Sequence, residues 1–307
     1  MTSPRPAVAI PCFLFVLMAS AVGCEDNGVN GEPPTLRPTL LYMETPPGGN
    51  GRITARNLDG TGRDVLTSGD NAWAPGDVTP DGRVILFFGP TGPGTDQEIL
   101  TMNYAGFGVE QVTDDPWQDS AASFLPDGRI IYASSHGSQF DIYRTDADGS
   151  NVTQLTTDIG TEGDPSLSPD GTKIVFSRAI KDIWVMNADG TGATNLTTFG
   201  AGERGGYPRF SPDGSKIAFL YALNNDQDLM IMDASGANRT NLTSSDPLFY
   251  YGSACFSLDG QHIYVCASTT LNGQRDIHRL DANGANRIQI TDTEADEAFL
   301  RVVNLLR

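Results

Sequence analysis

The chain has 307 residues, which is enough for one large domain or two small ones. Its 38 acidic and 20 basic residues give a formal net charge of −18, and this argues against a nucleic-acid partner because phosphate binding needs a concentrated basic face. The 34 glycines and 19 prolines supply turns, while Val, Ile, Phe, Tyr and Thr recur in short runs, so the composition favours strands.

Residues 1–23 have the pattern of a signal peptide. Arg5 and the amino terminus form a small positive region, and an apolar stretch over residues 7–22 follows. This stretch is short for a membrane-spanning helix. It ends in Ala21-Val22-Gly23-Cys24, which resembles the lipobox of bacterial lipoproteins and implies cleavage before Cys24 and a lipid on its thiol. The alternative is an ordinary secretory signal in which Cys24 is incidental.

Residues 24–38 are predicted to form a disordered tether, because they are polar and rich in Gly and Pro. A flexible chain of roughly 14 residues reaches about 20 Å. Glu25 follows the cysteine, and its resemblance to enterobacterial sorting signals favours the outer membrane. We therefore expect a lipid-anchored protein of the bacterial cell envelope that faces the periplasm, with its folded domain over residues 39–307.

The folded part is repetitive, and a Pro-Asp-Gly type of turn recurs in it. Pro presets φ, Asp tolerates the next position and Gly takes a positive φ, so this sequence suits a tight hairpin. Each turn precedes a short apolar run that reads as a strand. The five copies are Thr79-Pro80-Asp81-Gly82, Leu125-Pro126-Asp127-Gly128, Ser168-Pro169-Asp170-Gly171, Ser211-Pro212-Asp213-Gly214 and Ser257-Leu258-Asp259-Gly260.

A second turn, mostly of the Asp-Gly or Ala-x-Gly type, alternates with the first. Each copy follows an apolar strand and precedes a short strand that ends in Leu-Thr or a variant, so one period of about 45 residues is a four-stranded antiparallel meander. These turns are faintly similar to calcium loops, but turn stabilisation by the Asp side chain explains them better. The six copies end at Gly60, Gly106, Gly149, Gly190, Gly236 and Gly284.

The two ends of the repeat region are complementary. Residues 40–67 supply the last three strands of a repeat, and the missing first strand is predicted near the C-terminus, where Asp296 and Phe299 are matched with Asp164 and Leu167. The predicted fold is therefore all-β, a monomeric six-bladed β-propeller of four-stranded antiparallel blades whose closing blade is shared by N- and C-terminal strands.

The repeat resembles the propeller domain of TolB and the related propellers of dipeptidyl-peptidase-type enzymes. The resemblance is carried by the Pro-Asp-Gly turn at 168–171, the strands around 174–177 and 182–186, and Asn195-Leu196-Thr197. It covers about residues 39–303 and implies a propeller. The expected chain departs from TolB in one respect, since a signal peptide and a tether stand where TolB has an α/β domain before its propeller. Because propellers host many activities, the resemblance implies a fold more than a function.

The residues give little sign of catalysis. A propeller-containing peptidase needs a hydrolase domain with a G-x-S-x-G elbow, and the sequence contains no such pentapeptide. His136, His262 and His278 lack the spacing of a metal site, and His278 is expected to pack against an adjacent blade. We therefore predict no enzyme activity, no cofactor and no metal.

Cys255 and Cys266 flank the last Pro-Asp-Gly type of turn on adjacent strands. An envelope location would permit a disulfide between them. A hairpin that pairs Ser257 with Gln261 would set Cys255 opposite Ile263, so we favour two buried thiols and leave the disulfide as the alternative.

The residues before each innermost strand are expected to line one mouth of the central channel. Acidic and aromatic side chains gather there, which suits contact with a ligand or partner, although the solvated rim of an acidic protein would look similar. The candidate contact residues are Trp73, Asp119, Glu162, Asp164, Tyr207, Tyr251, Glu294 and Asp296.

The leading functional hypothesis is a non-catalytic binding or scaffolding protein that contacts another envelope protein through this mouth. The alternative is an enzyme or small-molecule binder with a cation held by Asp119, Glu162 and Glu294, which requires these carboxylates to converge. A purely structural envelope component is the third possibility.

Overall fold

The computed structural model describes residues 34–68, 71–92, 94–136, 139–224, 226–244, 249–268, 270 and 273–307, and of residues 249–252 the backbone only. The predicted signal peptide, the lipidated Cys24 and most of the predicted tether lie outside these residues. Thr35–Arg307 forms one compact unit. No helix in the described part of the chain is long and apolar enough to cross a bilayer.

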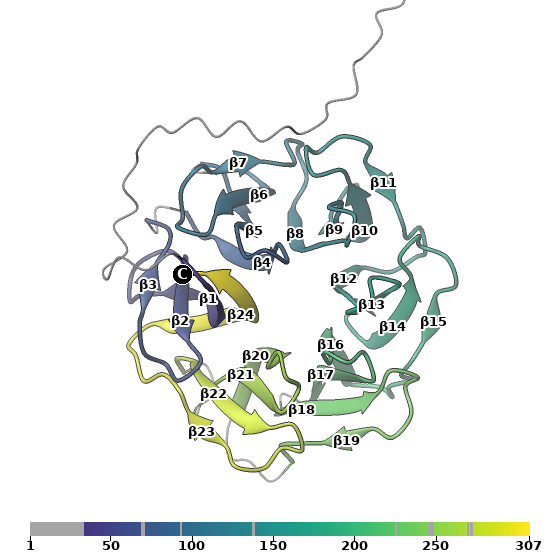
Figure 1. Cartoon of the computed structure of the whole chain (residues 1–307). Coiled ribbons are helices and arrows are strands. Elements are labelled where there is room, and N and C mark those ends of the chain that lie inside the picture. Colours follow the sequence, from purple (N-terminus) through teal and green to yellow (C-terminus); the bar gives the residue numbers. More distant parts are fainter. Residues whose placement is uncertain are drawn as a thin grey trace, which may run out of the picture. The chain divides into compact units, whose positions relative to one another are not determined.

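In this part of the chain, 24 strands form six antiparallel sheets of four strands each, arranged in a ring (Figure 1). The predicted six-bladed β-propeller is confirmed. Blades 1 to 5 are β4–β7, β8–β11, β12–β15, β16–β19 and β20–β23, and blade 6 is β24, β1, β2 and β3. The innermost strands, in blade order, are β4 (Ala74–Val78), β8 (Asp119–Phe124), β12 (Glu162–Leu167), β16 (Glu203–Phe210), β20 (Phe249–Phe256) and β24 (Asp296–Leu306).

The other strands follow in order from the ring axis outward. The second strands are β5 (Val84–Pro90), β9 (Ile130–Ser134), β13 (Lys173–Arg178), β17 (Lys216–Leu223), β21 (His262–Ser268) and β1 (Leu36–Thr45). The third strands are β6 (Gln97–Asn103), β10 (Asp141–Thr145), β14 (Asp182–Asn187), β18 (Asp226–Asp233), β22 (Asp276–Asp281) and β2 (Arg52–Asn57). The outermost strands are β7 (Glu110–Gln111), β11 (Thr153–Gln154), β15 (Thr194–Asn195), β19 (Thr240–Asn241), β23 (Ile288–Gln289) and β3 (Asp64–Val65).

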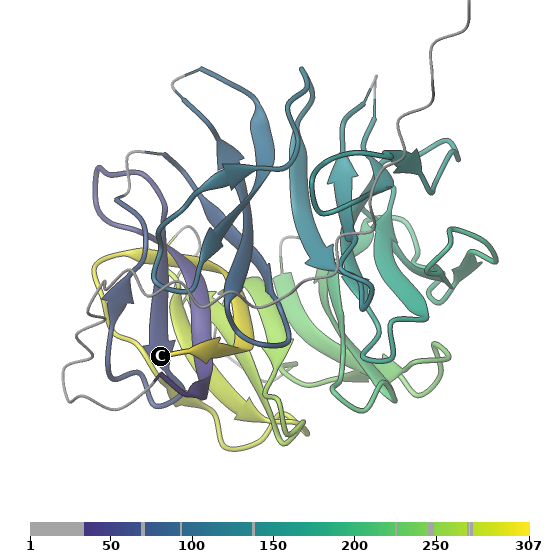
Figure 2. The same ribbon diagram turned by 45° about the horizontal axis from the view of Figure 1, so that its top comes forward.

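The strand directions give the ring two different faces (Figure 2). Each innermost strand begins at one face, where the loops between second and third strands also lie; we call this the entry face. The Pro-Asp-Gly and Asp-Gly turns lie at the opposite face, which we call the turn face. In the Pro-Asp-Gly turns the Asp side chain accepts the N–H two residues ahead, as Asp170 does from Thr172 at 3.0 Å. In the Asp-Gly turns Asp59, Asp148 and Asp189 accept the N–H two residues ahead in the same way, so the predicted stabilisation of these turns by the Asp side chain is confirmed.

The hydrophobic core lies between the sheets. Alternate residues of one strand face opposite neighbours: Phe87 of β5 packs towards blade 6, whereas Phe88 packs towards Tyr132 of blade 2. The second-turn glycines lie where two blades touch. At Gly149 the chain has φ 80°, and a Cβ would meet the Val112 carbonyl oxygen of blade 1 at 1.9 Å, so a larger residue would push the blades apart.

In all six blades a threonine just after the outermost strand accepts a backbone N–H of the third strand with its hydroxyl; we call this contact the threonine tie. In blade 4, Thr243 Oγ1 accepts the Leu229 N–H at 2.9 Å and donates to Asp228 Oδ1 at 3.0 Å. This hydroxyl satisfies a backbone donor that no fourth-strand carbonyl reaches. The Leu-Thr pattern in the sequence therefore marks a buried hydrogen bond. The six threonines are Thr67, Thr113, Thr156, Thr197, Thr243 and Thr291.

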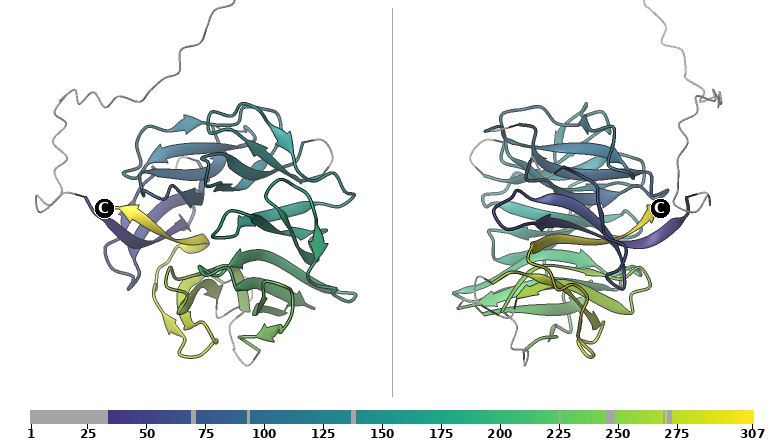
Figure 3. Two further views of the ribbon diagram at one scale, coloured as in Figure 1. Left: turned by 45° about the vertical axis from the view of Figure 1, so that its right-hand side comes forward. Right: turned by 90° about the vertical axis from the view of Figure 1, so that its left-hand side faces the viewer.

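The ring closes by antiparallel pairing of β1 with β24 (Figure 3). Their register runs from Leu36 opposite Leu306 to Thr45 opposite Asp296. β1 thus begins at Leu36, ahead of the predicted domain start at residue 39. The shared closing blade is confirmed.

The predicted register of the closing strand is wrong. At the bulges of β8, β12, β16 and β24 one residue takes positive φ, and in β24 this residue is Phe299 (φ 52°), the equivalent of Asp164 (φ 55°) in β12. Glu297 therefore corresponds to Glu162, whereas the predicted match of Asp296 with Asp164 would have placed Glu294 there. No Pro-Asp-Gly turn follows β24, so the sequence offers no fixed point for the register of this strand, and Asp296 was matched with Asp164 for that reason.

Cys255 and Cys266 are both unpaired and buried, so the prediction of two thiols is confirmed. Their neighbours differ from those expected, since Cys255 lies opposite Tyr264 and Cys266 opposite Ser253. The reason is that Ser257 N–H donates to His262 O at 2.9 Å, which makes the hairpin loop one residue longer than a pairing of Ser257 with Gln261.

Replacing Thr243 with Val tests the threonine tie. Thr243→Val keeps the shape of the side chain but leaves the buried Leu229 N–H without an acceptor, so we expect the free energy of unfolding to fall by about 1–3 kcal/mol. Urea denaturation measures this loss. Thr240→Val, at an exposed position of β19 three residues before Thr243, is the control and should change stability by less than about 0.5 kcal/mol. Equal losses for the two variants would contradict a role for the tie.

Candidate functional site

The predicted mouth residues fall into two groups, of which one is buried in the wall of the ring. Asp119 and Glu162 are both 0 % exposed, because each lies at the junction between its own blade and the preceding one. Neither side chain is available to a partner at the surface. They are instead buried charges between blades, and groups of the neighbouring strands must stabilise them.

The remaining residues at the starts of the innermost strands are of mixed character. Trp73 packs on Phe87 with ring centroids 5.1 Å apart, and its Nε1 donates to the Pro90 carbonyl at 2.9 Å. It therefore supports the wall while remaining partly exposed. Glu294 is exposed in the connection before β24. Tyr251 has its backbone in β20, and its side chain lies outside the described residues.

Asp164 and Tyr207, two of the candidate contact residues, lie together at the boundary between blades 3 and 4. The backbone N–H of Tyr207 donates to Asp164 Oδ2 at 3.3 Å, which links β12 to β16 across a blade boundary. Both residues have positive φ, at 55° and 52°. The Asp164 carboxylate is the main cause of the raised pKa of Tyr207, because it disfavours the negative phenolate. The two side chains are partly exposed near the axis of the ring.

Asp296 lies beside a cation, Arg275, that was not among the predicted residues. Arg275 lies before β22 and binds both carboxylate oxygens of Asp296, with Nε to Oδ1 at 2.8 Å. Burial would raise the pKa of Asp296, but the hydrogen bonds from Arg275 outweigh it and hold the pKa below its ordinary value. Arg275 also lowers the pKa of Tyr207, so its charge acts on the same region.

Two further arginines were not predicted. Arg209 of β16 and Arg301 of β24 occupy equivalent positions of the innermost strands, and each is bound by backbone carbonyls of its neighbour, Asp164 O and Gly76 O respectively. Burial and repulsion from Arg301 lower the pKa of Arg209 to about 9. Their equivalents in other blades are neutral or acidic, so the repeat pattern gave no signal for them.

The buried carboxylates at the blade junctions differ in their partners. Glu162 forms an ion pair with Arg178, Nε to Oε1 at 2.7 Å. Glu297 accepts the N–H of Ile277 at 3.0 Å and the hydroxyl of Thr291. Burial is the largest cause that raises the pKa of both glutamates to about 7.

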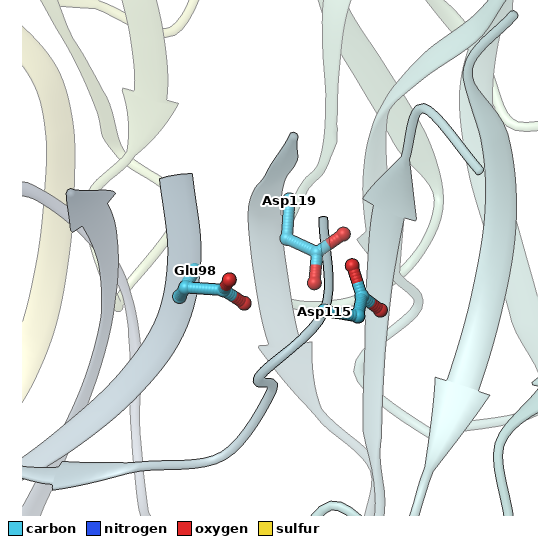
Figure 4. Close-up of side chains that lie close together, drawn as sticks. All are labelled: Glu98, Asp115 and Asp119. Carbon is cyan, nitrogen blue, oxygen red and sulfur yellow. The ribbon is translucent and has the colours of Figure 1, made fainter. Parts of the chain in front are cut away.

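A third junction gathers three carboxylates. Glu98, Asp115 and Asp119 each place an oxygen within 4.8 Å of the other two (Figure 4). Burial is the largest cause that raises the pKa of Glu98 to about 7 and that of Asp119 to about 6. Among the described residues this is the group with metal-ligand spacing. The cation site suggested for Asp119, Glu162 and Glu294 does not form, since these three do not meet.

The histidines take no part in that group. His136 stacks on Tyr143 with ring centroids 5.7 Å apart and lies beside Trp117. His278 is 6 % exposed in β22, at the position of Tyr143 and Trp184 in their own blades, so it is buried in the ring.

Two exposed isoleucines at the entry face were missed. Ile159 is 100 % exposed and Ile180 is 64 % exposed. Their loops are neighbours, because Asp158 pairs with Arg178 at 2.9 Å and a Cβ on Gly160 would lie 3.8 Å from the Ala179 Cβ. Both isoleucines fall in connections between strands, where the repeat pattern gives no signal, and neither is charged or aromatic like the candidate contact residues.

A pocket lies at the turn face, between blades 3 and 4. Asp170, Lys173 and Asp213 are among its lining residues. None of the predicted contact residues reaches it, because they all lie towards the entry face.

Glu297→Gln tests the buried charge. A carboxyl group whose folded pKa is raised contributes most stability below its unfolded pKa, near 4.5, and loses it as the pH rises through about 7. Glutamine does not titrate. We therefore expect the variant to gain about 1–3 kcal/mol relative to wild type between pH 4.5 and pH 8, from the size of the shift. Urea denaturation at both pH values measures it, with the exposed Glu294→Gln as control. An unchanged pH dependence would refute the assignment.

Comparison with known proteins gives the family. The TolB β-propeller domain family matches residues 90–246, half of the chain. No curated protein matches the chain in sequence. Among solved structures, TolB from Acinetobacter baumannii is 20% identical with a TM-score of 0.74, over 87% of this chain and 66% of that one.

Two other structures share the fold. A putative TolB from Agrobacterium tumefaciens is 16% identical with a TM-score of 0.65, over 88% of this chain and 99% of that one. Hydrazine synthase from Kuenenia stuttgartiensis is 18% identical with a TM-score of 0.73, over 91% of this chain and 48% of that one. The resemblance drawn from the repeat is confirmed: the chain belongs to the TolB β-propeller domain family.

Proposed function

We propose that this protein is a non-catalytic binding or scaffolding component of the bacterial cell envelope, which contacts a protein partner through its entry face. The observation that carries the proposal is Ile180, an exposed apolar side chain in a backbone conformation that isoleucine avoids. The likeness of the fold to hydrazine synthase does not decide the question, because one propeller fold serves many activities.

Ile180 lies at the tip of the hairpin between β13 and β14. Lys181 N–H donates to Arg178 O at 3.1 Å, and the two central residues, Ala179 and Ile180, have φ of 57° and 51°. Such turns favour Asn-Gly, because a left-handed conformation costs an L-residue about 1–2 kcal/mol and most for a β-branched one. The turn thus retains a destabilising residue and presents its side chain to solvent.

The surroundings of Ile180 suit a protein interface. Ile159 adds a second exposed apolar side chain on the adjacent loop. Asp164 supplies a carboxylate nearer the ring axis, on β12, which follows the Ile159 loop, and Tyr207 supplies a phenol on the adjacent innermost strand β16. Apolar and aromatic groups with a polar rim are typical of protein contact surfaces. The net charge of −18 favours a partner with a basic face.

The proposed location rests on the sequence. A lipid on Cys24 and a tether up to the start of β1 would hold the ring close to a membrane, facing the periplasm, with the outer membrane favoured by Glu25. Stable attachment needs more than one acyl chain, as lipoprotein modification supplies.

Site-specific crosslinking tests the partner surface. A photo-reactive phenylalanine analogue at position 180 or 159, in the lipoprotein expressed in its own envelope, should yield one discrete heavier species. The same group at Val152 is the matched control, because Val152 is 53 % exposed and apolar but lies at the turn face after β10. No product at positions 180 and 159, or the same product at position 152, would refute the proposal.

Ile180→Asn separates stability from binding. Asparagine tolerates positive φ, so we expect the free energy of unfolding to rise by about 1 kcal/mol. The amount of partner recovered should fall at the same time, because the apolar contact is lost. Denaturation and quantitative co-purification measure the two effects, and Val152→Asn should change neither. A variant that is more stable and still recovers the full amount of partner would show that Ile180 serves no contact.

A further inference from the structure

The first observation concerns Asp119 at the junction of blades 1 and 2. Its side chain is 0 % exposed, and neither Oδ1 nor Oδ2 accepts a well-formed hydrogen bond. The nearby hydroxyls of Ser134 and Thr113 only moderate its pKa. Ser134 Oγ is also buried without a hydrogen-bond partner. A buried carboxylate without a partner is costly, so the junction as it stands lacks a positive group.

The equivalent junction between blades 2 and 3 shows what such a group does. There Glu162 replaces Asp119 and lies opposite Arg178 in the β12–β13 pair, and the two form an ion pair at 2.7 Å. In the β8–β9 pair, Asp119 lies opposite Ser134. The junction of blades 1 and 2 therefore keeps the buried acid, as Asp119, but has the hydroxyl of Ser134 where the next junction has Arg178.

The closing junction gives a second comparison. Glu44 is 2 % exposed opposite Glu297 and binds both Arg52 and Arg63, with Arg63 Nη2 to Oε2 at 2.6 Å. At this junction two acids, Glu44 and Glu297, lie opposite each other, and two guanidinium groups bind Glu44. The need for positive charge is thus met by protein side chains at two junctions of the ring.

Two more carboxylates lie at the junction of blades 1 and 2. Glu98, 4 % exposed on β6, accepts the Thr113 hydroxyl at 2.6 Å. Asp115, in the β7–β8 connection, is partly exposed and accepts the Trp117 N–H at 2.9 Å. Figure 4 shows the carboxylate of Glu98 directed towards those of Asp115 and Asp119. Within the described part of the chain, no Lys or Arg forms an ion pair with any of the three.

We propose that Glu98, Asp115 and Asp119, with the hydroxyl of Ser134, form a binding site for a hard divalent cation, Ca²⁺, that joins blade 1 to blade 2. The cation takes the place that Arg178 occupies one junction further along the ring. The site is independent of the partner surface at Ile180, so either proposal can fail without the other.

The ligand chemistry selects calcium. All four groups offer oxygen, and hard cations prefer oxygen ligands. Two oxygens on one Ca²⁺ lie at most about 5 Å apart, since each bond is about 2.3–2.6 Å, and the carboxylates meet this limit at 4.8 Å. Mg²⁺ needs shorter bonds in a strict octahedron. Because Asp115 is partly exposed, the ion can enter from the loop side while Asp119 binds it from within.

The test uses the full chain in detergent, stripped with a chelator and then titrated with CaCl₂. Calorimetry should give one bound Ca²⁺ per chain, with a rise in the unfolding temperature. Terbium, a calcium analogue, should show luminescence sensitised by Trp117, which lies next to the ligands. Asp119→Asn should weaken Ca²⁺ binding by roughly 100-fold or more, and Asp115→Asn by roughly 10-fold.

The controls separate the site from general acidity. Glu162→Gln removes an equally buried junction carboxylate and should leave the Ca²⁺ affinity within about threefold. Asp115→Asn changes a partly exposed side chain, so it reports on binding even if Asp119→Asn folds poorly. The proposal is overturned if wild type binds no Ca²⁺ up to about 10 mM, tenfold above the weakest extracellular calcium modules. It is also overturned if both Asp variants bind as wild type does.

Discussion

The burial of carboxylates between neighbouring blades is the constraint on which the interior of this ring depends. A strand that starts with an acid on the inner side of a blade loses its hydration when the next blade packs against it, and that loss must be balanced. Glu162 is balanced by Arg178 and Glu44 by two arginines, while Glu297 uses a backbone N–H and a hydroxyl. The blades have the same backbone fold, but the groups that stabilise the buried carboxylate differ from one junction to the next.

Much of the fold could be predicted from the sequence, because each turn depends on a few consecutive residues. In the five Pro-Asp-Gly turns the aspartate side chain accepts a backbone N–H two residues away, and the glycine takes positive φ, so these interactions lie within five consecutive residues. The period of these turns then gave the number of blades and the shared sixth blade. The register of β24 was misassigned because that strand pairs with β1 and is followed by no such turn.

The site was predicted less well, because it depends on contacts between repeats. Asp164 and Tyr207 were named only as separate members of the mouth, and the structure brings them together because they lie at equivalent bulges of adjacent innermost strands. Asp119 and Glu162 were expected at a solvent-facing rim and are wholly buried, because the alternation along a strand does not tell which neighbour covers its end. The exposed Ile180 breaks the residue preference of its turn, a departure visible only once its φ is known.

The pairing of β1 with β24 has a consequence for how the protein reaches this state. These strands come from opposite ends of the described chain, so their contacts have the greatest sequence separation in the ring and the largest loop-closure entropy. Blades 1 to 5 are each continuous in sequence and can form early, whereas blade 6 must await β24. Until then the backbone of β1 has an unpaired edge open to strands of other molecules. The rate of the last closure, more than the stability of any blade, then sets how long newly made chains remain prone to self-association.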